Sequence, residues 1–505
     1  MLLRFLFYCV IITNTICVIV KTGATVNNKD PNIILILTDD QDFVLQGLFP
    51  MIQAQKHIAL KGITFMNAFT SSPICCPSRA SLLSGLYAHN TKTKNNSVAG
   101  GCYSNHWKSH IEPKSLPVQL KNEGYQTFFA GKYLNEYNSV KVPPGWTEFF
   151  GLHGNSKYYN YTLTENGKIK NYSDKYLTDL LNEKILNFLD TKDKTKPFFA
   201  MLTPPAPHEP FTPADRHNGS YTGTKALRTP NFNQVYGPLE KHWLVSSSKR
   251  IPWSVLETMD IYFQKRWESL LAVDEMIGNI INKLSKIKEI DNTYIILTSD
   301  NGYHIGQFAQ PFDKRQPYET DIRVPFLIRG PNIQPKSIST YPVALIDLYP
   351  TILNIANIPL SGMEDGISFN KYLSIKESDY EYDKNYHRQI LIEYWGEGND
   401  NTWNPDCPYK RIDHLSLCNA AADCHCQDSW NNTYSCIRHF TYRTNRIYCE
   451  FKDDQNFVEI YDLQTDLYQI DNLGNKLLPS ERALYSLALK NLTRCTGITC
   501  RETGW

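Results

Sequence analysis

Short apolar runs alternate along this chain with segments of helical periodicity, and this alternation limits the folds that the chain can adopt. The runs at 32–37, 126–130, 197–202 and 293–297 have the length and composition of buried strands. Between the last two, apolar residues recur at helical spacing and predict a helix over one sheet face: Trp267, Leu270, Leu271, Ile277, Ile280, Ile281 and Leu284. The pattern therefore predicts an α/β domain with a large mixed, mostly parallel central sheet flanked by helices.

Acidic and amide side chains follow two of these strands at the point where each strand ends. The first strand leads into Thr38-Asp39-Asp40, and the fourth leads into Ser299-Asp300-Asn301-Gly302. Ligands of open α/β sheets bind beyond the carboxyl ends of the strands, so this edge is the expected site. Such oxygen ligands suit a hard cation such as Ca²⁺ or Mg²⁺ far better than zinc. Taken alone, each segment is equally typical of a polar turn.

A cysteine-containing segment carries the strongest chemical signal in the chain. It reads Cys75-Cys76-Pro77-Ser78-Arg79-Ala80-Ser81-Leu82-Leu83-Ser84-Gly85. In isolation it is also consistent with a cysteine pair beside a helix N-terminus, with Pro77 at an early helical position. Its C-x-P-S-R start and closing Ser-Gly resemble the signature of the sulfatase family. The resemblance implies that formylglycine-generating enzyme oxidises Cys75 to formylglycine (3-oxoalanine), and that the protein hydrolyses sulfate esters.

The same resemblance implies roles for residues that lie far apart in the sequence. It implies an alkaline-phosphatase-like fold with a smaller C-terminal α+β subdomain that contains an antiparallel sheet, and one Ca²⁺ per chain. The implied metal ligands are Asp39, Asp40, the oxidised Cys75, Asp300 and Asn301. The implied residues of the sulfate pocket are Arg79, Lys132, His208 and Lys314. In the implied mechanism the hydrated aldehyde attacks sulfur, the cations stabilise the transferring group, and His208 or a lysine protonates the departing sugar oxygen.

One stretch departs from the pattern of many sulfatases. Where they have Lys-x-His, this chain has Lys132-Tyr133-Leu134-Asn135, so the histidine credited there with deprotonating the second hydroxyl is missing. His304, which follows the predicted metal ligands, is a candidate substitute or substrate contact, and Asn135 is another candidate contact. His304 is equally consistent with a structural histidine.

Residues 131–137 narrow the resemblance to the branch of sulfatases that act on glucosamine 6-sulfate. The segments 155–162, 313–318 and 431–436 agree with that branch. The implied reaction removes the 6-sulfate from N-acetyl-D-glucosamine 6-sulfate at the non-reducing end of heparan sulfate and keratan sulfate. The implied partner is a sulfated glycosaminoglycan, and the implied compartment is the lysosome, with secretion as the alternative.

Three other functions stay open. Heparan 6-O-endosulfatases share residues 131–137, but they carry a long basic insert, whereas here 52 Lys and Arg balance 51 Asp and Glu. A catalytically inactive glycan-binding relative would have lost a metal ligand or Cys75, and all are present. A phosphoester or phosphonate hydrolase of the same superfold shares the metal carboxylates, so the fold alone does not exclude it.

The N-terminus has the pattern of a secretory signal peptide, expected to span residues 1–24. Arg4 precedes an apolar run from 5 to 20 that is polar at 13–15. This run is shorter than the ~20 apolar residues that a membrane span needs, so we expect no membrane anchor. The formal net charge is +1 and no basic tail is present, so nucleic acid is not an expected partner. The sequence leaves the oligomeric state open, with a homodimer as one expectation.

Secretion changes how the 13 cysteines are interpreted. Two fall in the expected signal peptide, and the resemblance implies that Cys75 is oxidised; eight of the remaining ten lie beyond Asp400. We expect a catalytic domain at 29–375, a linker at 376–388 and a disulfide-rich subdomain at 389–505. Cys424-His425-Cys426 is compatible with zinc, although an oxidising compartment favours disulfides. Sequons predict glycosylation at Asn95, Asn160, Asn171, Asn218, Asn431 and Asn491.

Overall fold

The computed structural model describes residues 30–374, 387–397, 404, 407, 415–429 and 432–501. The predicted signal peptide (1–24) and the sequon at Asn431 lie outside these residues. So does most of the predicted linker, whose last two residues, His387 and Arg388, begin strand β13 (His387–Tyr394).

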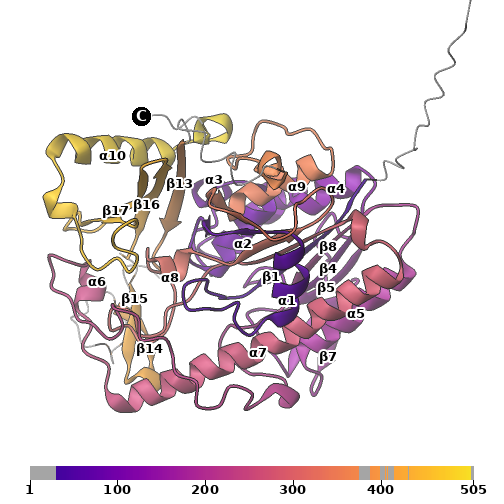
Figure 1. Cartoon of the computed structure of the whole chain (residues 1–505), viewed down its shortest axis with the longest axis horizontal. Coiled ribbons are helices and arrows are strands. Elements are labelled where there is room, and N and C mark those ends of the chain that lie inside the picture. The colour runs from indigo at the N-terminus through magenta and orange to yellow at the C-terminus, as the bar shows by residue number, and fades with distance from the viewer. Residues whose placement is uncertain are drawn as a thin grey trace, which may run out of the picture.

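A ten-stranded sheet forms the centre of the molecule, in the order β11-β2-β10-β9-β1-β8-β4-β5-β6-β7 (Figure 1). Its middle strands pair in parallel: β9 (Thr293–Ser299), β1 (Asn32–Thr38), β8 (Phe198–Thr203), β4 (Gln126–Lys132) and β5 (Glu148–Leu152). The outer strands make it mixed: β2 (Ile63–Phe65), β6 (Tyr161–Glu165), β7 (Lys168–Tyr172), β10 (Phe326–Arg329) and β11 (Ser337–Ser339). The predicted fold class is confirmed, and each of the four predicted strands extends one or two residues further toward its carboxyl end.

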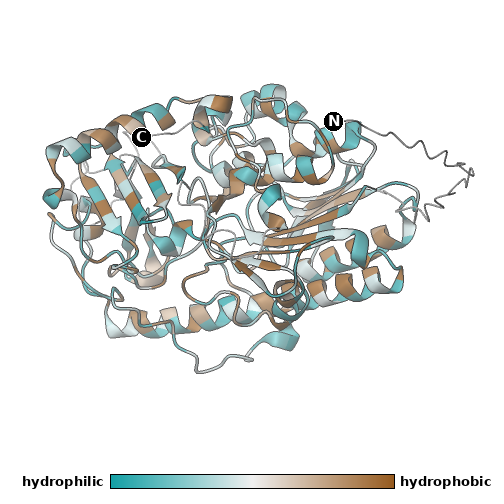
Figure 2. Cartoon of the chain, turned by 45° about the horizontal axis from the view of Figure 1, so that its top comes forward, coloured by the Kyte–Doolittle hydropathy of each residue, from teal (hydrophilic) through white to brown (hydrophobic). Residues whose placement is uncertain are grey.

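Helices cover both faces of this sheet. On one face lie α1 (Ile52–His57), α5 (Leu177–Thr191) and α7 (Trp253–Lys286), which pack against Ile34 and Ile36 of β1. On the other lie α2 (Cys75–Ser84), α4 (Leu116–Asn122) and α9 (Leu348–Ile355), which pack against Ile33, Leu35 and Leu37. Because alternate residues of a strand point to opposite faces, the continuous apolar run of β1 serves both layers. The brown central strands of Figure 2 lie between these helices, and α7 carries the predicted apolar stripe.

A second sheet, entirely antiparallel, lies beside the first. It contains β13, β16 (Tyr434–Thr441), β17 (Thr444–Phe451) and β18 (Val458–Asp462), with α10 (Pro479–Leu492) packed against it (Figure 1). A hairpin of β14 (Leu415–Asn419) and β15 (His425–Ser429) completes this C-terminal region. The remaining short elements are β3 (Ala68–Phe69), β12 (Val343–Ala344), α3 (Ala88–Thr91), α6 (Trp243–Ser246) and α8 (Glu319–Ile322).

Disulfides staple the C-terminal region, as predicted. Four of them lie there, joining Cys407 to Cys426, Cys418 to Cys424, Cys436 to Cys449, and Cys495 to Cys500. Both cysteines of the Cys424-His425-Cys426 segment are therefore in disulfides and not available to zinc. A fifth disulfide joins Cys76 to Cys102 beside the start of α2.

The C-terminal sheet shares a hydrophobic core with the larger domain. Phe69 and Ile74, which precede α2, are buried in the same cluster as Ile390 of β13 and Ile437 of β16. The predicted domain boundary near residue 376 is not tested by this packing, because the hydrophobic core is continuous between the two regions.

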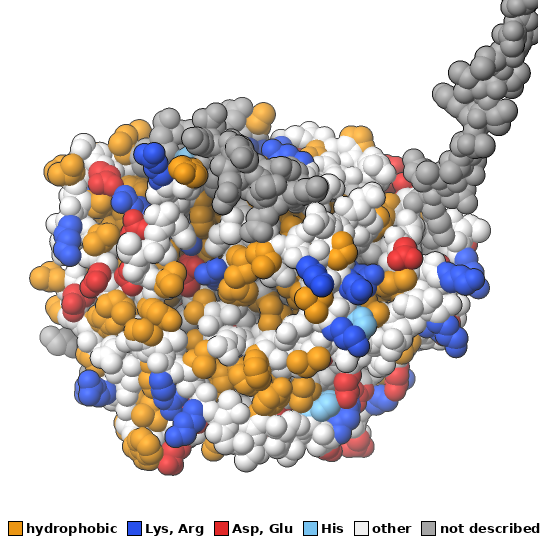
Figure 3. All heavy atoms as spheres, viewed as in Figure 1, with side chains coloured by type: hydrophobic (Ala, Val, Ile, Leu, Met, Phe, Trp, Pro, Cys, Tyr) orange, Lys and Arg blue, Asp and Glu red, His pale blue; other side chains and the backbone are white. Residues whose placement is uncertain are grey.

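On the face of the molecule shown in Figure 3, basic and acidic side chains are interspersed. In the part of the chain that is described, no helix is long and apolar enough to span a membrane.

Candidate active site

The carboxyl ends of β1 and β9 bring four oxygen-bearing side chains together. These strands pair in parallel with Thr38 opposite Ser299, so the residues that follow them are neighbours. The backbone N–H of Asp40 donates to Asp300 Oδ1 at 3.1 Å, and Asn301 Nδ2 donates to Asp40 Oδ1 at 2.7 Å. Asp39, Asp40, Asp300 and Asn301 are all fully buried. The two predicted acidic segments therefore form one cluster and are not separate solvated turns.

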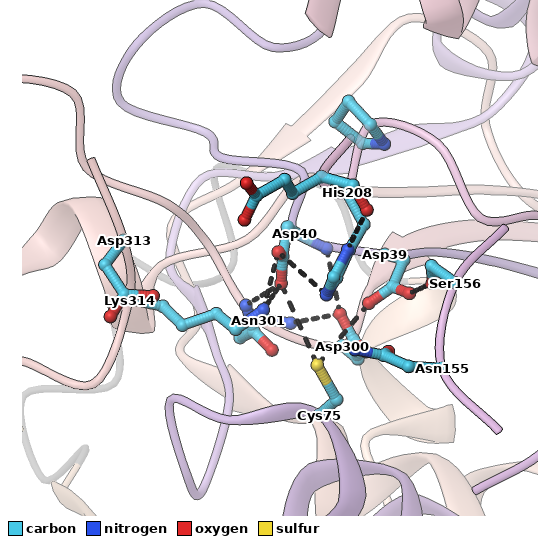
Figure 4. Close-up of polar contacts among 12 residues, drawn as sticks. Asp39, Asp40, Cys75, Asn155, Ser156, His208, Asp300, Asn301, Asp313 and Lys314 are labelled. Carbon is cyan, nitrogen blue, oxygen red and sulfur yellow. Dashed lines mark hydrogen bonds and ion pairs between the residues drawn. The ribbon is translucent and has the colours of Figure 1, made fainter. Parts of the chain in front are cut away.

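Cys75 is the first residue of α2 and lies against this cluster (Figure 4). Its Sγ is 3.6 Å from Asp39 Oδ1 and 3.9 Å from Asp40 Oδ1. The side chain is fully buried, and burial raises the pKa of the thiol to about 12. An unmodified Cys75 therefore stays protonated near neutral pH and is a poor nucleophile.

Three cations neutralise the three carboxylates of the cluster. Lys132, the last residue of β4, donates to Asp39 Oδ2 at 2.8 Å. Lys314 donates to both oxygens of Asp40, at 2.6 and 2.7 Å. Arg79, one turn into α2, donates through Nε to Asp300 Oδ2 at 2.7 Å. All three cations predicted for the sulfate pocket are thus in the cluster.

The donor set fits a hard divalent cation. Asn301 Oδ1 is buried and has no hydrogen-bond partner among the described residues. Burial, and then the charge of Asp39, raise the pKa of Asp300 to about 7, as expected where carboxylates crowd together. Ligand atoms of Asp39, Asp40, Cys75 and His208 lie within 4.8 Å of one another. The carboxylates of Asp39, Asp40 and Asp300 and the free amide oxygen of Asn301 are the kinds of ligand that Ca²⁺ takes.

His208 lies above the carboxylates in the loop after β8. Its Nδ1 is 2.6 Å from the carbonyl oxygen of Glu209, so Nδ1 carries the proton, and Nε2 is 3.7 Å from Asp40 Oδ2. Tyr158 OH donates to the His208 carbonyl oxygen at 2.7 Å and fixes the loop. Burial, and then Lys314, lower the pKa of His208 to about 4. The imidazole is therefore neutral in this arrangement.

The two candidate substrate contacts lie at different distances from the cluster. Asn135 Nδ2 is 3.3 Å from Asn155 Oδ1, and the next residue, Ser156, donates to Asp39 Oδ2. Asn135 therefore lies at the edge of the site. His304 Nδ1 instead pairs with Asp321 at 3.1 Å, and none of its described contacts is with Cys75 or its carboxylates. Its assignment as a substitute base remains a prediction.

Sequence reasoning missed two serines of the site. Ser156 contacts Asp39 from the loop between β5 and β6, as Figure 4 shows. Ser78 Oγ donates to the carbonyl oxygen of Asp300 at 2.5 Å. Each lies in a segment that carried the family resemblance, but neither residue type nor spacing marks a serine as a partner of a distant aspartate.

The sequons differ in exposure. Asn160, Asn171, Asn218 and Asn491 are exposed. Asn95 is only 7% exposed, and its Oδ1 accepts the N–H and O–H of Ser97. Glycosylation remains a prediction at every site, and Asn95 is the least accessible of the five described.

Comparisons with known proteins agree with this geometry. The family model described as Sulfatase matches residues 31–358. N-acetylglucosamine-6-sulfatase of Homo sapiens is 43% identical over 495 residues, which are 95% of this chain and 88% of that protein. An extracellular sulfatase SULF-1 homolog of Drosophila melanogaster is 38% identical over 69% of this chain but only 32% of its own length.

Among solved structures, one described as a complex with its substrate D-glucosamine-2-N,6-O-disulfate has the same fold. It superposes with a TM-score of 0.72 at 24% sequence identity, covering 94% of this chain and 99% of that one. At this sequence identity the structural similarity is evidence for the fold alone.

Proposed function

The chain belongs to the sulfatase family and is a sulfuric ester hydrolase. From this premise we propose that it removes the 6-sulfate of N-acetyl-D-glucosamine 6-sulfate at the non-reducing end of heparan sulfate and keratan sulfate. The observation that carries the proposal is the 43% identity with human N-acetylglucosamine-6-sulfatase over 95% of the chain. The cluster around Cys75 supports it, because it holds the carboxylates, cations and histidine that this chemistry needs.

The charge of the cluster suits an anionic ester. Three carboxylates face three cations, so the protein groups alone are close to neutral. A Ca²⁺ held by Asp39, Asp40, Asp300 and Asn301 would supply positive charge, and formylglycine at position 75 would supply a hydrated aldehyde oxygen as the nucleophile. The pocket as a whole would then attract a sulfate group.

Lys132, Lys314 and Arg79 bind and orient that sulfate. Each charged hydrogen bond contributes about 1.5–3 kcal/mol, and enzymes lower barriers by roughly 8–23 kcal/mol. Several cations are therefore needed around one transferring group. Their fixed positions matter as much as their charge, and both lysines are held by buried carboxylates at 2.6–2.8 Å.

His208 is the proposed proton donor to the departing sugar oxygen. Its carbonyl-bound Nδ1–H sets the ring orientation and leaves Nε2 toward the cluster. In the free protein the imidazole is neutral because burial and Lys314 lower its pKa. A bound anionic ester offsets the repulsion from Lys314 and favours the imidazolium, so substrate binding raises the pKa of His208 and promotes protonation of Nε2.

The runner-up is a heparan 6-O-endosulfatase. The Drosophila extracellular relative favours it, but this chain matches only 32% of that protein's length. The balanced charge of 52 basic and 51 acidic residues also offers no strongly basic segment to grip internal polysaccharide. We therefore place the exo-acting function first.

We further propose that formylglycine-generating enzyme modifies Cys75 and that the protein reaches the lysosome through the secretory pathway, where it acts as a monomer or homodimer. Five disulfides and four exposed sequons are in keeping with passage through that pathway. A mildly acidic optimum of activity is expected. An optimum well above neutral pH would contradict the lysosomal assignment.

The deciding experiment uses a heparan oligosaccharide with 6-sulfated glucosamine at both the non-reducing end and an internal position. Mass spectrometry then maps the sulfates lost. Loss at the terminus alone is expected, whereas internal loss would establish the endo-acting function. No loss from a sample whose position-75 aldehyde is confirmed would refute the proposed substrate.

A further inference from the structure

Two lysines converge on one tryptophan next to the active site. Lys94 Nζ lies 4.3 Å from the centre of the Trp395 ring, and Lys452 Nζ lies 4.5 Å from it. The two ammonium groups are therefore within about 9 Å of one another, which is close to the Debye length of about 8–10 Å. Both lysines are exposed, and they come from loops that follow α3 and β17. Three separate segments of the chain thus build one cationic feature.

Among the described residues, no carboxylate lies within ion-pair distance of either lysine, although Glu393 and Glu450 act on Lys452 from further away. Glu393 is paired with His89 Nδ1 at 2.8 Å. Glu450 accepts the hydroxyl of Tyr448 at 2.7 Å. Partial burial, and then like-charge repulsion from Lys94, lower the pKa of Lys452, and an anion in direct contact with both ammonium groups would relieve that repulsion more than the two distant glutamates do.

A short series of hydrogen bonds places this feature beside the catalytic cluster. The backbone N–H of Cys76 donates to Asn96 Oδ1 at 2.9 Å, and the N–H of Asn96 donates to Glu397 Oε1 at 3.2 Å. Arg315, the neighbour of Lys314, donates to Glu397 Oε2 at 2.8 Å.

Lys94 and Trp395 are each two residues from this series, a span of at most about 7 Å of extended chain. The lysine pair thus lies on segments that contact the start of α2 and Arg315, which suits a group on the sugar next to the one that is desulfated. Asn95, between Lys94 and Asn96, is buried and does not occupy this surface.

We propose that Lys94, Lys452 and Trp395 form a second anion-binding subsite, which takes a carboxylate or sulfate on the sugar that follows the terminal glucosamine. This inference rests on the proposed function, since it concerns the same glycosaminoglycan chain. The indole holds the two ammonium groups in place through its π-face without neutralising them. The formal net charge of the chain is only +1, so a local pair must supply the attraction.

The subsite predicts a preference among substrates. A uronic acid or sulfated sugar in the second position, as in heparan chains, offers the lysines an anion. A neutral galactose in that position, as in unsulfated stretches of keratan chains, does not. The protein should therefore favour the charged neighbour over the neutral one at equal terminal sulfation.

The kinetic test compares two substrates: N-acetylglucosamine 6-sulfate alone, and a heparan trisaccharide with the same sulfated residue at its non-reducing end. In the double variant Lys94→Gln/Lys452→Gln, the ratio of kcat/KM for the trisaccharide to kcat/KM for the monosaccharide should fall about tenfold, mainly through KM. The matched control is Lys490→Gln, an exposed lysine on α10, which should keep the wild-type ratio. An unchanged ratio in the double variant would overturn the subsite.

A binding measurement separates failure of the subsite from failure of the proposed function. Calorimetry on the full-length Cys75→Ala protein, with and without the two lysine substitutions, compares affinities for the same trisaccharide at low salt. About tenfold weaker binding is expected without the lysines, and equal affinities would overturn the subsite even if the wild-type protein desulfates neither sugar. Absence of turnover on both sugars would by itself refute the proposed function.

Discussion

The central parallel sheet and the C-terminal region contribute to one site in different ways. The sheet carries the groups that we propose to react at its strand ends, where Asp39, Lys132 and Asp300 meet Cys75. The C-terminal region places Glu397 and Asp428 around Arg315, the residue after Lys314. The groups proposed for the reaction thus come from the central sheet, and the C-terminal region supplies residues that position the segment of Lys314. Substitutions in the first part should act on turnover, and those in the second on stability and on how firmly Lys314 is held.

The largest effect is expected from Cys75→Ala. The substitution removes one buried sulfur that faces the carboxylates, while α2 keeps its other contacts. Turnover of N-acetylglucosamine 6-sulfate should fall by at least about 10⁴-fold, because no other side chain supplies the nucleophile. The melting temperature should stay within a few °C of the wild-type value. Substantial residual activity in a correctly folded variant would refute a nucleophile at position 75.

The next largest effect is expected from Asp300→Asn. One carboxylate of the oxygen set is lost, so both calcium affinity and the ion pair with Arg79 weaken. Activity should fall by roughly 10²–10³-fold, as for other single groups that stabilise a transition state. Elemental analysis of the purified protein should find less calcium than in the control Asp190→Asn, which alters an exposed carboxylate on α5. Unchanged calcium content would refute the ligand assignment.

The difference between the central sheet and the C-terminal region also explains which features could be predicted from the sequence. Central parallel strands are buried on both faces, so they appear as continuous apolar runs, and β1 and β9 were predicted with their polar ends. The family resemblance then identified Arg79, Lys132, His208 and Lys314, which the fold brings together.

The C-terminal region and the loops gave no comparable signal. Disulfide pairings depend on which cysteines meet in space, and the even number of cysteines allowed many pairings. Ser156 and Arg315 act through contacts with residues more than 80 positions away. The core shared by Ile74 and Ile437 also depends on tertiary packing that no local pattern reports.

Removing one disulfide from each region tests the same comparison, with a smaller expected effect on activity than Cys75→Ala or Asp300→Asn. Cys76–Cys102 closes a loop of 26 residues beside Cys75, and Cys436–Cys449 closes one of 13 between paired strands β16 and β17. Each double Cys→Ser variant should lose about 2–4 kcal/mol of stability by the chain-entropy model. Loss of Cys76–Cys102 should also lower kcat about tenfold, because this disulfide fixes the first turn of α2, where Cys75 lies. Equal kcat values for the two variants, measured well below their melting temperatures, would contradict this division.

The smallest effect is expected from the titration of Asp428. Its Oδ2 accepts the Tyr394 hydroxyl at 2.8 Å and the Glu397 N–H at 2.9 Å, and Arg315 Nε lies 3.8 Å away. Burial raises the pKa of Asp428 from 3.8 to about 7, against the lowering effect of Arg315. The folded protein therefore holds a proton that the unfolded chain releases, and the stability that this proton confers is complete below about pH 4.

That stability is lost as pH rises through about 7, so the folded protein should be more stable in mildly acidic solution, although the neutral carboxyl of Asp428 attracts Arg315 less than its carboxylate does. Asp428→Asn cannot titrate. Between pH 4.5 and 7.5 the melting temperature of the wild-type protein should fall by a few °C more than that of the variant. The exposed Asp454→Asn protein is the control and should follow the wild-type curve. Parallel curves for wild type and Asp428→Asn would show that the proton is not held at this carboxyl, and the acid dependence would then come from other buried carboxyls with raised pKa values, such as Asp274 and Asp300.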